Sequence, residues 1–174
     1  MTLAPGARKL LLAVHLTVSV GWIGSVLAYL ALGVAAVTSN ETQTVRSAWL
    51  FMELTGWYVV VPLAVAALLT GIAMALGTKW GLFRHYWVLF SLVLTVVATA
   101  VLLLHMPDVS ATADAAQQAE GAALEALGGD LAHPAIGLVV LLVIQVLNVY
   151  KPQGVTRYGW RKQHEEREGR ATGP

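Results

Sequence analysis

Three ionisable side chains from different apolar segments are expected at one level of the folded chain. His105 and His133 lie two residues inside the ends of two long uncharged segments, and Glu53 lies beside the start of another. Imidazoles and carboxylates bind divalent ions such as copper and zinc, and two imidazoles can also hold a haem iron while a carboxylate bonds to a ring N–H. The set predicts a metal site or a haem site. Hydrogen bonding among the three side chains at a wet interface is the simpler alternative.

A further candidate, His15, is expected deeper in an apolar segment. It follows the nearest preceding charge by six residues, which corresponds to about 9 Å along a helix. Trp22 and Tyr29 share its helical face, so this face should point toward other helices. Gln145 is expected at the same depth. One interpretation is a buried hydrogen-bonded pair of His15 and Gln145, and the other is ligation of haem or a metal by His15.

His85 is expected to differ from His105, although both lie in one apolar segment. The 20 residues between them place their side chains about 160° apart around a helix axis. We therefore expect His105 to face the interior and His85 to lie at the membrane surface, where Arg84 and His85 could bond to haem propionates or lipid phosphates. The chain has no cysteine, which excludes disulfides, thiolate ligands and the attachment of a c-type haem.

These side chains must be positioned by apolar helices. Of the residues, 57% are hydrophobic and 12% charged, and four stretches without Asp, Glu, Lys or Arg cover residues 10–40, 54–78, 85–107 and 131–150. About 20 apolar helical residues cross the ~30 Å core of a bilayer, where backbone amides must bond within the protein. The sequence predicts an all-α integral membrane four-helix bundle in one domain, residues 1–150, with spans at about 10–37, 48–77, 85–106 and 131–150.

The basic residues predict how this bundle is oriented. Ten of the eleven Lys and Arg residues precede the first span, follow the fourth or lie between the second and third, and only Arg46 falls on the other side. The positive-inside rule therefore places both termini in the cytoplasm of a multi-pass plasma-membrane protein. Residues 151–174 form a basic cytoplasmic tail, which we expect to touch anionic headgroups and to be disordered over its last ten residues.

The segment between the third and fourth spans is expected outside the cell. Residues 108–130 carry five acids and no base. Their composition favours a helix over residues 113–127, ended by Gly128 and Gly129. The segment is either an acidic helical cap over the outer mouth of the bundle or a flexible solvated loop.

Two features of the first and second spans predict helix packing. Small residues around Gly21 and Gly24 recur at helical spacing, as in close contacts between membrane helices. This face should pack on a neighbouring helix or on a second copy of the chain. Pro62 removes one backbone hydrogen bond and should kink its helix near Tyr58.

Several runs of residues resemble known membrane families. The run His15-Leu-Thr-Val-Ser-Val-Gly-Trp-Ile-Gly resembles the opening of copper-resistance-D-like membrane domains, in which a His is followed seven residues later by Trp-x-Gly. The runs Gly77-Thr-Lys-Trp-Gly-Leu-Phe-Arg-His-Tyr-Trp and Lys151-Pro-Gln-Gly-Val-Thr-Arg-Tyr-Gly-Trp are similar to actinobacterial four-span membrane proteins. Wider relatives include b561-like cytochromes and the membrane protoporphyrinogen oxidase, whose bundle histidines bind b-type haem. The resemblance implies haem b at His15, with Trp22 beside it, and an outer pair of His105 and His133.

Three functional interpretations follow. The first is a b-type haem protein that passes electrons between a quinone, the haem and an external acceptor. The second is an external copper- or zinc-binding or transport accessory that uses Glu53, His105 and His133 beneath acids that concentrate cations. The third is a structural membrane partner without chemistry of its own. Motifs of nucleotide-binding proteins, hydrolases and kinases and a nucleic-acid-binding surface are absent, and these residues do not decide whether the chain is an enzyme.

Overall fold

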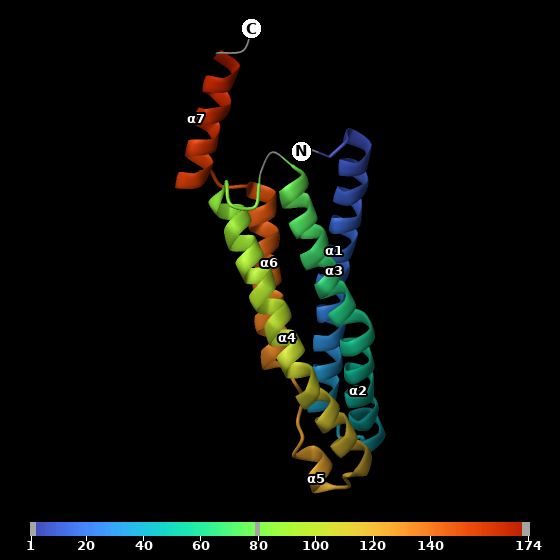
Figure 1. Cartoon of the computed structure of the whole chain (residues 1–174). Helices are drawn as coiled ribbons and strands as arrows, with labels where there is room; N and C mark the ends of the chain where they lie inside the picture. Colours follow the sequence, from blue (N-terminus) through green and yellow to red (C-terminus); the bar gives the residue numbers. More distant parts are fainter. Residues whose placement is uncertain (1–2, 79–80, 172–174) are drawn as a thin grey trace.

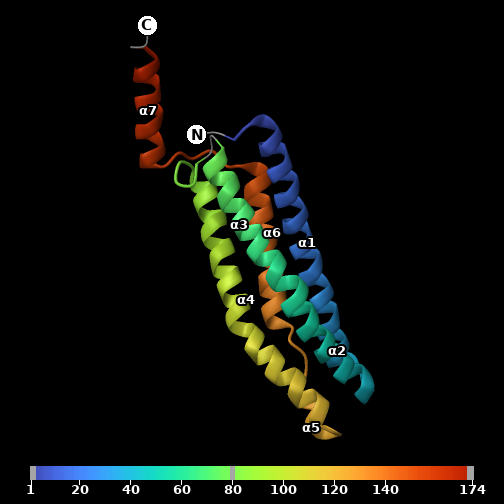
Figure 2. The same cartoon turned by 45° about the vertical axis from the view of Figure 1, so that its right-hand side comes forward.

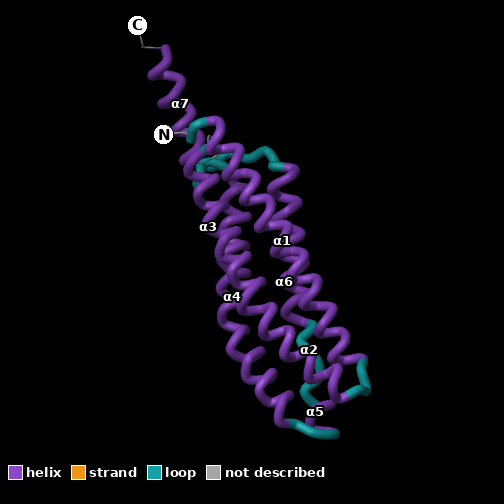
Figure 3. The backbone as a smooth tube through the Cα atoms, turned by 90° about the vertical axis from the view of Figure 1, so that its right-hand side faces the viewer, coloured by secondary structure: helices purple, strands orange, loops and turns teal. Residues whose placement is uncertain are grey.

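The described part of the chain is almost entirely helical. The computed structural model describes residues 3–78 and 81–171 (Figure 1). Its elements are α1 (Pro5–Thr38), α2 (Thr42–Thr55), the π-helical turn η1 (Gly56–Val60), α3 (Val61–Gly77), α4 (Tyr86–Gln118), α5 (Ala122–Glu125), α6 (Ala132–Tyr150) and α7 (Arg157–Ala171). Within these residues there is no β-strand (Figure 3), and the only β-type pairing is an isolated bridge between His85 and Val155. The predicted all-α class is confirmed.

Four helical segments are long and apolar enough to cross a membrane: Pro5–Thr38, Thr42–Gly77, Tyr86–Gln118 and Ala132–Tyr150. Helix α1 packs on α2, α3 and α6, and α4 packs on the same three helices. Each segment is therefore a neighbour of the next along the chain, and the fourth closes on the first, as in an antiparallel four-helix bundle (Figure 2). The turn that carries α5 lies at one end of this bundle, the α5 end, and α7 lies at the other, the α7 end.

Three of the four helical segments extend beyond the expected bounds, and α6 (Ala132–Tyr150) lies within them. Helix α4 continues through Pro107 to Gln118 because a proline removes only one helical hydrogen bond and the following residues are rich in alanine. The helix expected over residues 113–127 is divided between α4 and the short α5. Gly121 separates them with a φ of 55°, which favours glycine. The tail was also expected to be disordered at its end, but α7 reaches Ala171, and residues 172–174 lie outside the described residues.

The α5 end has an apolar core of its own. Helix α2 and the last turns of α4 bury Trp49, Met52 and Val109 against each other, and Leu124 of α5 covers them. Arg46 of α2 reaches the C-terminus of α4, where its Nε donates to the carbonyl of Ala116 at 3.1 Å and its Nη2 to that of Ala119 at 2.6 Å. A cation at this position satisfies helix-terminal carbonyls and complements the helix dipole.

The second span contains a π-helical turn just before Pro62. This turn is η1 (Gly56–Val60), and it includes Tyr58, near which the sequence predicts a kink. Met106 of α4 packs against this turn so closely that a Cβ at Gly56 would lie 2.5 Å from its Cε atom. A larger residue at Gly56 would displace the end of the Met106 side chain, which is flexible and can move.

The two small-residue positions of α1 have different surroundings. A Cβ at Gly21 would lie 3.6 Å from Leu63 of α3, whereas a Cβ at Gly24 would meet nothing within 4 Å. The predicted close packing is thus seen at Gly21, while Gly24 is exposed.

The tail begins by pairing with the turn before α4. The amide of Tyr86 donates to the carbonyl of Gly154 at 3.3 Å, and the amide of Thr156 donates to the carbonyl of Arg84 at 3.0 Å. The Thr156 hydroxyl accepts a hydrogen bond from the amide of Gly159 at 3.0 Å, so Thr156 is the N-cap of α7. Arg84 and the neighbouring His85 therefore lie at the α7 end, in contact with the tail.

Candidate metal centre

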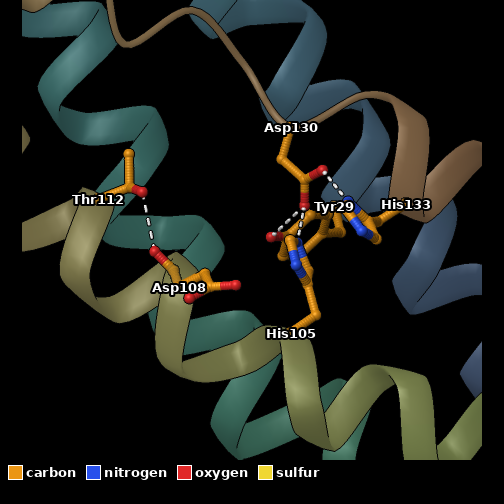
Figure 4. Close-up of polar contacts among 6 residues, drawn as sticks. All are labelled: Tyr29, His105, Asp108, Thr112, Asp130 and His133. Atoms are coloured by element: carbon orange, nitrogen blue, oxygen red, sulfur yellow. Dashed lines mark hydrogen bonds and ion pairs between the residues drawn. The ribbon is translucent and has the colours of Figure 1, made fainter.

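Two imidazoles meet one carboxylate at the α5 end (Figure 4). His105 Nε2 lies 2.7 Å from Asp130 Oδ2, and His133 Nδ1 lies 3.3 Å from Asp130 Oδ1. One potential ligand atom from each residue falls within 4.8 Å of the other two. In the described part of the chain, no other group of three or more His, Asp or Glu side chains is this compact.

The carboxylate at the centre of this group is buried. The side chain of Asp130 is 8% exposed, whereas those of His105 and His133 are 18% and 54% exposed. Tyr29 of α1 donates from its hydroxyl to Asp130 Oδ2 at 3.1 Å. A buried carboxylate is costly unless its oxygens are bonded, and here three side chains from α1, α4 and α6 supply the partners.

Two glycines allow the loop that carries Asp130 to reach α1. A Cβ on Gly33 of α1 would lie 2.6 Å from the backbone oxygen of Asp130, and a Cβ on Gly129 would collide with the carbonyl of Gly33. The carbonyl of Gly128 accepts a hydrogen bond of 3.2 Å from Trp49 Nε1, which holds the same loop from α2. The loop can press this closely on α1 only because both contact positions are glycines.

The sequence predicts the two imidazoles of this group but not its carboxylate. His105 and His133 do share one level, and their rings stack with centroids 3.7 Å apart and an interplanar angle of 19°. Glu53 is half-buried on α2 and does not belong to the group. Its neighbour Met52 is fully buried in the core that α2 shares with α4, and adjacent helical residues point about 100° apart, so Glu53 lies on a different side of α2 from Met52.

One signal in the sequence could have indicated Asp130. It lies three residues before His133 and directly after two glycines, a spacing that sets it apart from the other four acids of residues 108–130. Asp108 is the acid nearest to His105 along the chain, but Figure 4 shows its side chain apart from the group; its backbone carbonyl accepts a hydrogen bond from Thr112 at 2.8 Å. Proximity in sequence therefore does not select the carboxylate.

His15 lies toward the α7 end, where it lines a cavity of about 390 Å³ bounded by all four spans. Its Nδ1 lies 2.9 Å from the hydroxyl oxygen of Thr70. The same hydroxyl lies 2.6 Å from the carbonyl of Ala66 and 3.2 Å from that of Ala67. With the Thr70 proton on one of these carbonyls, a neutral imidazole donates from Nδ1 to Thr70 and keeps the lone pair of Nε2. Gln145 lines the same cavity, but the hydrogen-bond partner of His15 is Thr70.

The cavity around His15 has further polar side chains in its wall, and one of them has no hydrogen-bond partner among the described residues. The polar residues in this wall, besides His15, include Ser19, Ser91, Thr95, Gln145 and Asn148. The Ser91 hydroxyl is buried without a hydrogen-bond partner among the described residues. Arg84 and His85 are not part of the wall. Trp22, expected beside His15, is buried. It lines this cavity as well as a second one, which is also lined by His105, Asp130 and His133.

The geometry of the His105 and His133 imidazoles limits the kinds of cofactor that they could hold. A bis-histidine haem places its two axial imidazoles on opposite faces of the porphyrin. His105 and His133 instead stack on each other and share one carboxylate, which leaves no gap for a porphyrin between them. Two imidazoles and one carboxylate are a donor set used for zinc, copper and non-haem iron, with coordination positions left open.

Comparisons of the chain with protein-family models, with curated proteins and with solved structures found no match.

Proposed function

We propose that this chain is a multi-pass membrane protein that binds a divalent transition-metal ion of the copper, zinc or iron class through His105, Asp130 and His133. The observation that carries this proposal is the convergence of three potential ligand atoms within 4.8 Å around a carboxylate that is only 8% exposed. Structural hydrogen bonding alone does not require a second imidazole to stack on the first and to bond to the same carboxylate.

Binding an ion would replace the hydrogen bonds within the group by metal–ligand bonds. The two imidazoles must present lone pairs to the ion, so binding displaces protons from the ring nitrogens that now face Asp130. The hydroxyl of Tyr29, 3.1 Å from Asp130, would orient the carboxylate as an outer-shell partner. Three protein ligands leave at least one position open in a tetrahedral site.

The charge distribution supports an external location for this site. By the positive-inside rule the α5 end faces outward, and Arg46, the one basic residue there, bonds to the C-terminus of α4. The acids Asp108, Asp114 and Glu120 are exposed around the same end. Such a surface raises the local concentration of cations and favours capture from outside the cell.

Metal titration of the purified protein tests the proposal. The metal-free protein in detergent is titrated with Cu²⁺ and Zn²⁺ by calorimetry, and we expect one high-affinity site. Asp130→Asn or His133→Ala should weaken binding by more than the ~10- to 100-fold cost of losing an outer-shell partner, and Tyr29→Phe by about that range. Glu53→Gln is the matched control and should bind normally. Absence of binding, or an unchanged affinity in Asp130→Asn, would refute the proposal.

A second candidate function is the binding of b-type haem by His15. The observation that favours it is the Thr70 contact, which fixes the ring and leaves Nε2 available, as outer-shell partners of ligating histidines do. Gly71 gives the imidazole room, since a Cβ there would lie 3.2 Å from His15 Cε1. A quinone in the bilayer is the electron partner expected for such a haem.

Absorption spectra of membranes that contain the overexpressed protein test the haem candidate. A Soret band should be present, should be lost in His15→Ala and should survive in His105→Ala. A protein without this band, even after reconstitution with haem, would exclude it.

A further inference from the structure

The metal group forms one end of a cavity whose remaining wall is apolar. We propose that this cavity holds the hydrocarbon body of a lipid-soluble ligand while an oxygen atom of the same ligand, from a carboxylate, hydroxamate or enol, reaches the metal ion. The inference rests on the proposed metal centre and names the class of molecule that the centre accepts.

The composition of the cavity wall supports an apolar occupant. The cavity has a volume of about 300 Å³ and is lined at one end by Tyr29, His105, Asp130 and His133. The rest of the wall is made of apolar residues and glycine, contributed by α1, η1, α4 and α6. Water is poorly held in such a space because it finds few polar partners there. A ligand with a polar head and an apolar body matches both parts of the wall.

The entrance indicates that the ligand comes from the lipid phase. Among the residues that line the cavity, Val97 and Val101 of α4 and Ile136 of α6 are at least half exposed. All three belong to helices that are long and apolar enough to cross a membrane. The exposed part of the cavity wall therefore belongs to α4 and α6. In a bilayer crossed by these helices it would face the hydrocarbon, so that a lipid-soluble molecule would enter without crossing water.

The position of the metal group at the cavity edge gives the ligand access to the ion. His105, Asp130 and His133 all line the cavity as well as forming the group. Figure 4 shows the two imidazoles reaching toward each other from α4 and α6, with Asp130 descending from the loop on one side. An ion held by these three side chains has protein on the loop side, so its open coordination positions are on the side of the cavity.

Gly137 offers a way to fill the cavity without disturbing the ligands. It lines the wall, and a Cβ added there would meet nothing within 4 Å. A leucine at this position would occupy the space proposed for the ligand. Gly24 of α1 also has nothing within 4 Å of an added Cβ and does not line the cavity, so Gly24→Leu is a matched control.

The experiment compares two chelators on the Co²⁺-loaded protein, after metal uptake has been measured. Acetohydroxamate supplies the chelating head alone, and octanohydroxamate adds a hydrocarbon tail. We expect octanohydroxamate to shift the visible absorption of Co²⁺ with an affinity at least about tenfold higher, because its tail is buried. Gly137→Leu should abolish this preference at unchanged metal affinity, whereas Gly24→Leu should retain it.

The control variants separate the possible failures. Octanohydroxamate also partitions into detergent micelles, but this effect is equal for both variants and for the wild type. Equal affinities for the two chelators, or a preference that survives in Gly137→Leu, would overturn the ligand inference alone. A protein that takes up no metal would overturn both the inference and the proposed function.

Discussion

The His105–Asp130–His133 group at the α5 end and the cavity around His15 use polar side chains in opposite ways. At the α5 end, both oxygens of Asp130 are bonded, and Tyr29, His105 and His133 each have a partner in the chain. In the cavity around His15, the Ser91 hydroxyl has no partner among the described residues, and the His15 ring bonds through Nδ1 to Thr70.

This difference indicates what each region requires. Buried polar groups in proteins are nearly always hydrogen-bonded, so an open group marks a place for water or a ligand. The His105–Asp130–His133 group satisfies its polar atoms within the chain. The cavity around His15 leaves the Ser91 hydroxyl without a partner among the described residues, which marks it as a place where water or a ligand would find one.

The largest effect is expected from a substitution that moves the backbone of the loop carrying Asp130. In Gly129→Ala the added Cβ would collide with the carbonyl of Gly33, so the loop must retreat and carry Asp130 away from the imidazoles. We expect metal affinity to fall by about 10- to 100-fold and the free energy of unfolding to fall by about 1–3 kcal/mol. Calorimetry and unfolding in mixed detergent micelles measure the two effects.

The control for this change is Gly137→Ala, where the added Cβ meets nothing within 4 Å, and both quantities should be nearly unchanged there. If Gly129→Ala bound metal as the wild type does, the glycine contact could not be what positions Asp130.

The second prediction concerns the helix end that supports the outer region. Arg46→Ala removes the cation that bonds to two terminal carbonyls of α4, and hydrogen bonds to a charged group contribute about 1.5–3 kcal/mol. We expect a loss of stability in this range, together with faster amide exchange in residues 116–119. The exposed Arg8 is the control. An equal effect of Arg8→Ala would show that Arg46 acts by net charge alone.

The third prediction tests whether the cavity around His15 contains water. A cavity of about 390 Å³ with several polar residues in its wall has room and partners for ordered water, which would satisfy Ser91. Ser91→Ala should then lower the free energy of unfolding by about 0.5–1.5 kcal/mol. An increase in stability would mean instead that the hydroxyl is buried dry. Ser25→Ala serves as the comparison, because the Ser25 hydroxyl bonds within its own helix to the carbonyl of Trp22.

The smallest effect is expected from Thr70→Val, which tests which ring nitrogen of His15 carries the proton. Thr70→Val removes the acceptor of the Nδ1 hydrogen bond, at a cost of no more than about 1.5 kcal/mol. Nitrogen-15 NMR of labelled histidine should report the proton on Nδ1 in the wild type and a mixture of tautomers in the variant. A wild-type proton on Nε2 would contradict the assignment and weaken the haem candidate.

The four spans could be predicted because the requirement for them is local. A stretch of some 20 residues without charge specifies a membrane-length helix by its composition alone, and each of the four predicted spans lies largely within a helix of the structure. The ends were less predictable. Pro107 is a helix breaker by local rules, yet the packing of Met106 and Val109 in the core of the α5 end keeps α4 continuous.

The His105–Asp130–His133 group could be predicted only in part. The sequence indicates how far along a span a residue lies, but not toward which neighbouring helix its side chain points. Counting residues from the ends of the spans places His105 and His133 at one level. The role of Asp130 depends on a contact with Tyr29 across 101 residues of chain, which no periodicity encodes. His15 shows the same limit, since matching depth suggested Gln145 while the actual partner, Thr70, comes from another helix.

The π-helical turn at Gly56–Val60 makes the second span sensitive to a change in its length. A π turn contains one residue more than the equivalent α-helical turn, and each residue rotates a helix by about 100°. Deleting Val59 would let the segment become continuous α-helix and would turn the Trp49 and Met52 face by that angle relative to Ala64 and Ala67, which are buried on α3. Both faces could then no longer meet their partners, so a single deletion here should be far more damaging than a point substitution.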